Sequence, residues 1–216
     1  MIKNNFKPIL FSTPMVRAIM EGRKTQTRRI IKRELPDDAH GFHFLPKKDW
    51  TIKRKIDNTW AYFVDPKTGS WPCNDEDKLK CRYKINDILW VRETWQHTKC
   101  LNLHITDENY GYIYKADGLP WEDFEEWSWE PSIFMPKKAC RLFLELKDIR
   151  IEKLNDISPD DAIAEGMETV GLFLNYNGTN IEKFKKLWDL INGENSWNKN
   201  PFVWVYEFER TEASFV

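Results

Sequence analysis

Several segments of strictly alternating side chains, spread along the whole chain, set the strongest limit on its fold. The clearest is NDILWVRETW, residues 86–95, and the pattern recurs in residues 110–116, 140–154 and 202–210. A period of two residues indicates β-strands, and PILFS and TQTRRII near the start are read as two more. Strands separated by other segments, with few helical patterns between them, predict an α+β fold, mainly β, built as a small β-barrel with short helical additions.

Helical patterns are confined to three segments. PMVRAIMEG follows Thr13, a good N-cap, and ends at Gly22, which can adopt the left-handed conformation of helix C-termini. SPDDAIAEG offers Ser158 as N-cap and ends at Gly166, and residues 181–192 carry apolar side chains at helical spacing. We therefore expect short helices that support a sheet.

The length of 216 residues fits one domain covering residues 1–216, with insertions at about 34–84 and 96–139. The first insertion is rich in proline and charge, which predicts loops and short strands. The second contains an acidic, tryptophan-rich stretch, GLPWEDFEEWSWEPSIFMP. We expect its rings to pack onto the body of the domain.

The chain has 33 basic and 34 acidic residues, so its net charge of −1 gives no long-range attraction to nucleic acid or membranes. Any anion site must be local. The segment GRKTQTRRIIKR, residues 22–33, is the candidate, because it holds six basic residues and no acid. Strand alternation places Thr27 and Arg29 on one face, where Lys24 could join them, and Arg28 on the other.

Localisation and cofactors are constrained mainly by what the sequence lacks. No apolar run has the length of a signal peptide or a membrane span, so we expect a cytoplasmic protein without membrane contacts. The four cysteines form no CxxC pair and are expected to be free thiols. His97, Cys100 and His104 match no zinc spacing, and we expect neither metal nor cofactor, and a monomer.

Taken together, the blocks KPILFSTPMVRAIMEGRKTQTRRIIK, LWVRETW, DDAIAEG and VWVYEFE resemble the ASCH domains of the PUA-like superfamily. WEPSIFMPKKACRLFLELKDIRIEKLNDIS is similar to a longer branch found in phages and prophages. The resemblance spans both ends of the chain. It implies a PUA-like barrel whose cleft binds a nucleotide, a modified nucleoside or RNA.

The usual ASCH signature, G-x-K-x-x-E-x-R, is matched at Gly22, Lys24 and Arg29, but Thr27 replaces the glutamate. This departure resembles amidohydrolases of the same superfamily that remove the acetyl group from 4-acetylcytidine. The resemblance then implies Lys24, Thr27 and Glu165 as catalytic residues. Chemically, Lys24 would activate the Thr27 hydroxyl and Glu165 would protonate the leaving amine.

Three functions remain open at this point, together with a plainer interpretation of each motif. A binder of nucleotides or RNA would use Arg23, Arg28, Arg29, Trp90, Arg92 and Glu93. An enzyme would add amide hydrolysis at an acylated pyrimidine, and a phage protein-interaction module would bind a host protein through the tryptophan-rich insertion. Alternatively, the basic run is a solvated surface, Trp90 is a core residue, and Arg92 and Glu93 form a surface pair.

Overall fold

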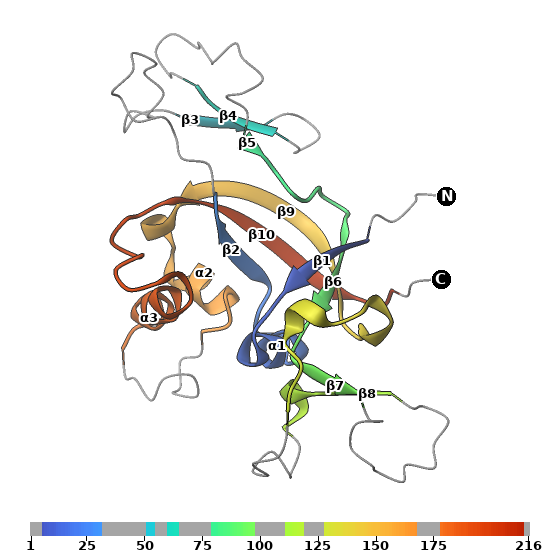
Figure 1. The fold of residues 1–216 in the computed structure, drawn as a ribbon. Helices are drawn as coiled ribbons and strands as arrows, with labels where there is room; N and C mark the ends of the chain where they lie inside the picture. Colours follow the sequence, from blue (N-terminus) through green and yellow to red (C-terminus); the bar gives the residue numbers. More distant parts are fainter. Residues whose placement is uncertain are drawn as a thin grey trace.

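In a computed structural model of the chain, residues 6–31, 51–54, 60–64, 79–97, 111–118, 128–167 and 178–213 are described, the stretch 51–80 as backbone only. The described residues form an α+β fold dominated by strands, as predicted (Figure 1). The cysteines at positions 73 and 100 lie outside these ranges, and Cys81 and Cys140 are free thiols.

A five-stranded sheet is the centre of the fold. Its strands lie in the order β1 (Phe6–Leu10), β6 (Ile88–Arg92), β9 (Phe143–Lys153), β10 (Phe202–Thr211) and β2 (Gln26–Ile30). Only the β1–β6 pair is parallel within this sheet. β9 and β10 arch together over the other strands in Figure 1, and their register shifts between Glu207 and Phe208. Such a bulge bends a strand pair and adds curvature.

The curved sheet does not close into a continuous barrel. β1 and β2 are its two edges, and no ladder joins them among the described residues. A side-chain hydrogen bond crosses between the edges, where Arg29 Nη2 donates to the Leu10 carbonyl at 2.9 Å. We call the space between β1 and β2 the seam. It is where the predicted barrel remains open.

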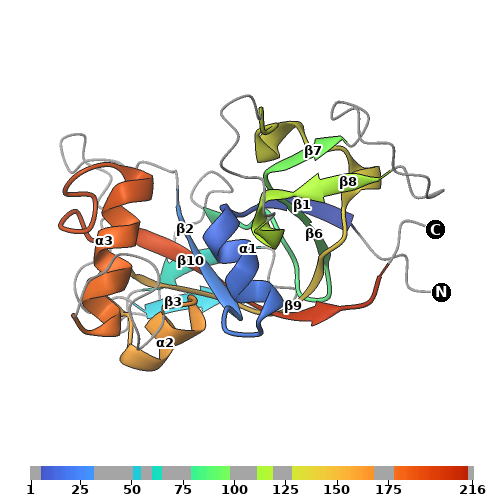
Figure 2. The ribbon, with the colours of Figure 1, turned by 90° about the horizontal axis from the view of Figure 1, so that it is seen from below.

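Three α-helices pack against the sheet. They are α1 (Thr13–Met20), α2 (Pro159–Ala164) and α3 (Asn180–Asn192), and α2 and α3 lie side by side in Figures 1 and 2. α1 begins one residue earlier than predicted, with Ser12 at the N-cap and Pro14 in the first turn. The N-cap of α2 is Ser158, as predicted, and it forms a capping box with Asp161.

The core fills the space between the sheet and these helices. Leu144, Leu146, Val203 and Val205 of the two long strands are fully buried. They meet the inner faces of the helices, including Val16 of α1 and Leu187 of α3. A smaller apolar cluster of Ile88, Trp90 and Phe143 lies apart from this core.

Two smaller sheets lie within the expected insertions. β3 (Thr51–Arg54), β4 (Trp60–Val64) and β5 (Leu79–Lys80) form one, and β7 (Trp95–His97) pairs with β8 (Tyr112–Tyr114) in the other. The strand expected over residues 86–95 is therefore two strands, β6 and β7. Cys81 and Tyr83, at the end of the first expected insertion, belong to the main core.

Short 3-10 helices complete the described chain: η4 (Lys115–Asp117), η5 (Ser132–Phe134), η6 (Lys137–Ala139) and η7 (Leu154–Asp156). Arg17 of α1 ties η4 to the domain by donating to the Ala116 carbonyl at 2.8 Å. Within the described part of the chain, no helix has the length and apolar character needed to cross a membrane.

We predict that α3 depends on its inner face for stability. Leu187 is 7% exposed, whereas Leu190, one turn further along the same helix, is 74% exposed. Leu187→Ala should lower the free energy of unfolding by about 2–5 kcal/mol, because it leaves a cavity in the core. Leu190→Ala should change it by less than about 0.5 kcal/mol. Urea denaturation of both variants measures the difference, and equal effects would contradict the packing described.

Candidate functional site

The basic run after α1 is held against the end of α2. The amides of Arg23 and Lys24 both donate to the Ala18 carbonyl, and Gly22 provides the left-handed turn with φ 75°. Thr25 donates its amide to the Ala164 carbonyl at 2.9 Å. The backbone therefore delivers Lys24 directly to Glu165, the residue that follows α2.

Lys24 and Glu165 form a buried ion pair. Lys24 Nζ lies 2.8 Å from Glu165 Oε2 and 2.8 Å from its carbonyl oxygen, and both residues are at most 3% exposed. A Cβ on Gly166 would lie 3.1 Å from the Cβ of Ala18 and 3.3 Å from that of Lys24. With φ 94°, this position suits glycine for both space and conformation.

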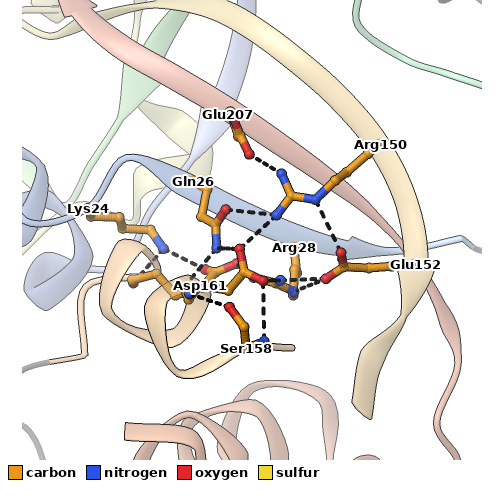
Figure 3. A network of polar contacts seen from close by, with 9 residues as sticks. Lys24, Gln26, Arg28, Arg150, Glu152, Ser158, Asp161 and Glu207 are labelled. Carbon is orange, nitrogen blue, oxygen red and sulfur yellow. Dashed lines mark hydrogen bonds and ion pairs between the residues drawn. The ribbon is translucent and has the colours of Figure 1, made fainter. Parts of the chain in front are cut away.

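Arg28 lies beside this pair and is surrounded by carboxylates. Its side chain is fully buried, with Glu165 Oε1 at 3.0 Å and Asp161 Oδ2 at 3.2 Å. Its Nε also donates to Glu152 Oε1 at 2.9 Å (Figure 3). A buried guanidinium with three carboxylates keeps its charge compensated by several hydrogen bonds.

The same polar contacts continue through Arg150 (Figure 3). Its Nη2 donates to Asp161 Oδ1 at 2.8 Å, and the side chain also pairs with Glu207 of β10. Gln26 contacts both residues of the Arg150–Asp161 pair. Its Nε2 donates to Asp161 Oδ1 at 3.0 Å, and its Oε1 accepts from Arg150 Nη2 at 3.1 Å. We call this set the buried charge cluster; its members are Lys24, Gln26, Arg28, Arg150, Glu152, Asp161, Glu165 and Glu207.

Burial and pairing shift the pKa values of Lys24 and Asp161 within the cluster. Burial lowers the pKa of Lys24, and the adjacent Glu165 carboxylate only partly opposes this shift. For Asp161, burial acts to raise the pKa, but hydrogen bonds from Gln26 and Ser158, with the charge of Arg28, bring it below its ordinary value. Asp161 is therefore held as a carboxylate, whereas burial favours the neutral amine of Lys24.

Thr27 and Glu165 meet at a cavity of about 60 Å³ between β2 and α3. Trp188 and Asn192 of α3 and Arg28 and Arg29 of β2 contribute to its wall. Thr27 is 1% exposed. Within the described structure, no hydrogen bond involves the Thr27 hydroxyl. Lys24 is absent from the lining and reaches the cavity only through Glu165.

A much larger cleft of about 1020 Å³ opens at the seam. Both edge strands line it, β1 through residues 8–10 and β2 through Arg29 and Ile30. Its walls also include the aromatic side chains of Phe11, Tyr83, Trp204 and Tyr206. Since the cleft and the small cavity share Met15, Arg29, Ile30 and Ile191, these residues form the wall between them.

Three arginines face the cleft without a compensating acid. Arg29, Arg82 and Arg92 come from different segments, and no aspartate or glutamate occurs among the described lining residues. None of the three forms an ion pair with another described residue. Arg29 lies 5.4 Å from the centre of the Phe11 ring, and burial lowers its pKa. The described lining of the cleft therefore carries positive charge and no acid, in contrast to the buried charge cluster.

Not all residues predicted for binding reach this cleft. Arg23 pairs with Glu21 on the surface, at 2.7 Å from Nε to Oε2. Trp90 is 5% exposed within the smaller apolar cluster, so it offers no platform for a base. Glu93 pairs with Arg141, at 2.9 Å, instead of with Arg92. The alternative of a surface pair between Arg92 and Glu93 is wrong, because Glu93, which directly follows β6, is buried against Arg141.

Glu93 has a structural environment of its own. It is 1% exposed, and burial raises its pKa although the Arg141 guanidinium acts against this. Its amide donates to the Met135 sulfur at 3.2 Å. These contacts fasten the second insertion to β6 and give Glu93 no access to the cleft.

Sequence reasoning missed Arg82, Tyr83, Trp204 and Tyr206 as lining residues. Arg82 and Tyr83 lie in the segment assigned to the first insertion, and only its alternation, CRYK, hinted that it joins the domain. Trp204 and Tyr206 share one face of the last strand, which could be read from the pattern. That this face meets Arg29 depends on strand order, which the sequence does not reveal.

The metal prediction concerns residues that are only partly described. His97 lies in β7, whereas positions 73, 100 and 104 fall outside the described ranges. Among the described residues, no group of three or more histidine, cysteine, aspartate or glutamate side chains could hold a metal ion. The absence of zinc stays a prediction.

Comparison of the chain with protein-family models, with curated proteins and with solved structures found no significant match. The chemistry of the site must therefore be argued from its own geometry.

We predict that Arg28 holds the buried charge cluster together. Arg28→Met should lower the free energy of unfolding by about 3–5 kcal/mol at pH 7, because three carboxylates lose their shared cation. Arg210→Met, on the exposed end of β10, should cost less than about 0.5 kcal/mol. Urea denaturation at pH 7 and pH 5 gives both values.

The pH dependence has a defined sign. Arg28 is one of the groups that hold the pKa of Asp161 below its ordinary value, so without Arg28 this folded-state pKa rises and the folded variant takes up a proton more readily than folded wild type. Its deficit relative to wild type should shrink from pH 7 to pH 5. A deficit that is constant or grows on acidification would show that charge is not what Arg28 contributes.

Proposed function

We propose that the chain is an ASCH-type, PUA-like domain whose seam cleft binds a nucleotide, a modified nucleoside or RNA. The observation that carries the proposal is the contrast between Arg28 and Arg29. Arg28 contacts three carboxylates. Arg29, the next residue, faces a cleft without described acids. Cations left uncompensated in a concave site suit an anionic ligand.

The dimensions and chemistry of the cleft support this ligand class. Its volume of about 1020 Å³ lies at the upper end of the range for small-molecule sites, enough for a nucleotide with adjoining groups. Guanidinium groups bind phosphate through paired hydrogen bonds. Leu10 and Ile191, which are 43% and 54% exposed, offer apolar surface to a base, whereas the rings of Tyr83, Trp204 and Tyr206 line the cleft but are at most 6% exposed.

Each residue that matches the ASCH signature has a defined place in the structure, which supports the assignment. Gly22 forms the turn, Lys24 pairs with Glu165, and Arg29 lines the cleft. Under the proposal, the ligand lies in the cleft at the open seam between β1 and β2. The proposal thus uses the same residues that suggested the family from sequence.

We predict that Arg29 dominates the affinity for nucleotides. Arg29→Gln should weaken binding of nucleoside monophosphates and of a single-stranded octanucleotide about 10- to 100-fold, since a hydrogen bond to a charged group is worth about 1.5–3 kcal/mol. Arg23→Gln is the matched control, because Arg23 belongs to the same basic run but pairs with Glu21 outside the cleft. Calorimetry with RNA and DNA versions measures both variants.

Each outcome of this experiment is informative when the thermal melts of the variants match that of wild type. Affinity lost in Arg29→Gln and kept in Arg23→Gln supports the seam cleft. Equal losses would place binding on general surface charge. Wild-type protein that binds none of these ligands contradicts the proposed function.

A second candidate function, amide hydrolysis on an acylated pyrimidine nucleoside, is favoured by the environment of Thr27. Its hydroxyl has no described hydrogen-bond partner, it lines one cavity with Glu165, and Lys24 pairs with that glutamate. The cavity of about 60 Å³ holds about two water molecules, so only an acyl group would enter it while the nucleoside occupied the cleft. Burial lowers the pKa of Lys24, which is the direction that a general base requires, while its Nζ is held by Glu165 at 2.8 Å.

Under this second candidate, Thr27→Val should abolish release of acetate from 4-acetylcytidine. It should weaken binding by only about 0.5–1.5 kcal/mol, the worth of one hydrogen bond. Thr25→Val is the matched control, because Thr25 is a neighbouring threonine that is exposed to solvent. Chromatography of the products follows turnover. Binding of the nucleoside by wild type without release of acetate would eliminate the enzyme and leave the binding protein.

A further inference from the structure

We infer that residues 131–139 form a second contact surface, on which Phe134 stacks against a base of a single-stranded nucleic acid whose neighbouring nucleotide lies in the seam cleft. The inference rests on the proposed function and extends it from a single nucleotide to a strand. It starts from a turn that is anchored in the domain yet exposes large apolar side chains.

The turn presents large apolar side chains to solvent. Ile133 is 56% exposed and Phe134 is 66% exposed, although both belong to a segment that is otherwise anchored in the domain. Met135 and Ala139, in contrast, are 1% exposed. The segment is therefore anchored by Met135 and Ala139, while Ile133 and Phe134 face solvent.

The backbone of the turn is fixed by its own hydrogen bonds. The amides of Phe134 and Met135 donate to the carbonyls of Pro131 and Ser132, at 3.0 Å and 3.2 Å. The following 3-10 turn, η6, is closed in the same way, with Cys140 donating to Lys137 at 2.9 Å. An exposed ring on such a fixed backbone costs little conformational entropy when it binds a partner.

The turn borders the seam cleft. Ser132, two residues before Phe134, lines the same cleft as Arg29, Arg82 and Arg92. In Figure 1 the turn is the yellow coil beside β6, next to α1. A ligand that leaves the cleft at Ser132 would therefore pass along this turn.

Charge selects the kind of partner. Residues 131–139 contain no acid, and Lys137 and Lys138 are exposed within the same turn. Together with the arginines of the cleft, whose described lining holds no acid, these lysines surround an exposed ring with basic residues of the same region. Aromatic rings between cations are the arrangement with which proteins bind single strands, in which bases stack and phosphates pair.

The test compares ligands of two lengths on variants of one residue. Nucleoside monophosphates and a single-stranded octanucleotide are titrated into wild type, Phe134→Ala, Phe134→Leu and Phe134→Trp. Ile163→Ala is the control, because it removes a partly exposed apolar side chain from α2, outside the turn. Because Phe134 is exposed, each variant should keep the wild-type melting temperature.

We expect Phe134→Ala and Phe134→Leu to weaken binding of the octanucleotide about 5- to 100-fold, which corresponds to the loss of one stacked base. Phe134→Trp should retain the wild-type affinity, and monophosphate binding should not change in any variant. Lys138→Gln should lower the slope of log affinity against log salt by about one ion.

Contrary results separate the two proposals. Wild type that binds monophosphates and the octanucleotide, with Phe134→Ala unchanged, would overturn the strand contact and leave the seam cleft intact. Equal strand affinity of Phe134→Leu and wild type would overturn stacking and indicate an apolar surface for another partner, such as a protein. No binding of either ligand by wild type would remove both proposals.

Discussion

The contacts of Arg28 with three carboxylates are the interaction on which the rest of the structure depends. They join β2 to β9 through Glu152 and to the α2 region through Asp161 and Glu165. A buried arginine without such partners would be strongly destabilising, so the cluster must form as a unit. Since Glu165 also receives Lys24, the same contacts fix the turn that leads into β2.

This cluster determines the direction of Arg29. Arg28 lies opposite Val205 of β10 and Arg29 lies opposite Trp204, so the two guanidinium groups leave β2 on different faces. One face is neutralised by carboxylates, and the other lines the cleft at the seam. The basic run therefore contributes to two different environments. Arg28 belongs to the buried charge cluster, and Arg29 lines the cleft. The seam exists because no ladder pairs β1 with β2 in the described part of the chain, where Arg29 donates across it to the Leu10 carbonyl.

Much of the local structure could be predicted from sequence, because short-range signals determine it. Ser158 and Gly166 bounded α2, and alternation identified β9 and β10 and placed Arg28 and Arg29 on opposite faces. What could not be predicted depended on long-range pairing. The open seam, the carboxylates that collect around Arg28, and the entry of Arg82 and Tyr206 into the cleft all follow from strand order. Trp90 was placed in a binding role because composition alone does not distinguish a buried ring from a stacking platform.

The central claim is that a nucleic-acid ligand occupies the seam. Photo-crosslinking of the full chain to a single-stranded RNA that carries 4-thiouridine, followed by peptide mass spectrometry, tests this claim most directly. The account predicts crosslinks within residues 8–15, 29–31, 82–94 or 204–206, which contain most of the described lining of the cleft. Crosslinks confined to segments away from the cleft, such as the exposed end of β10, would contradict it.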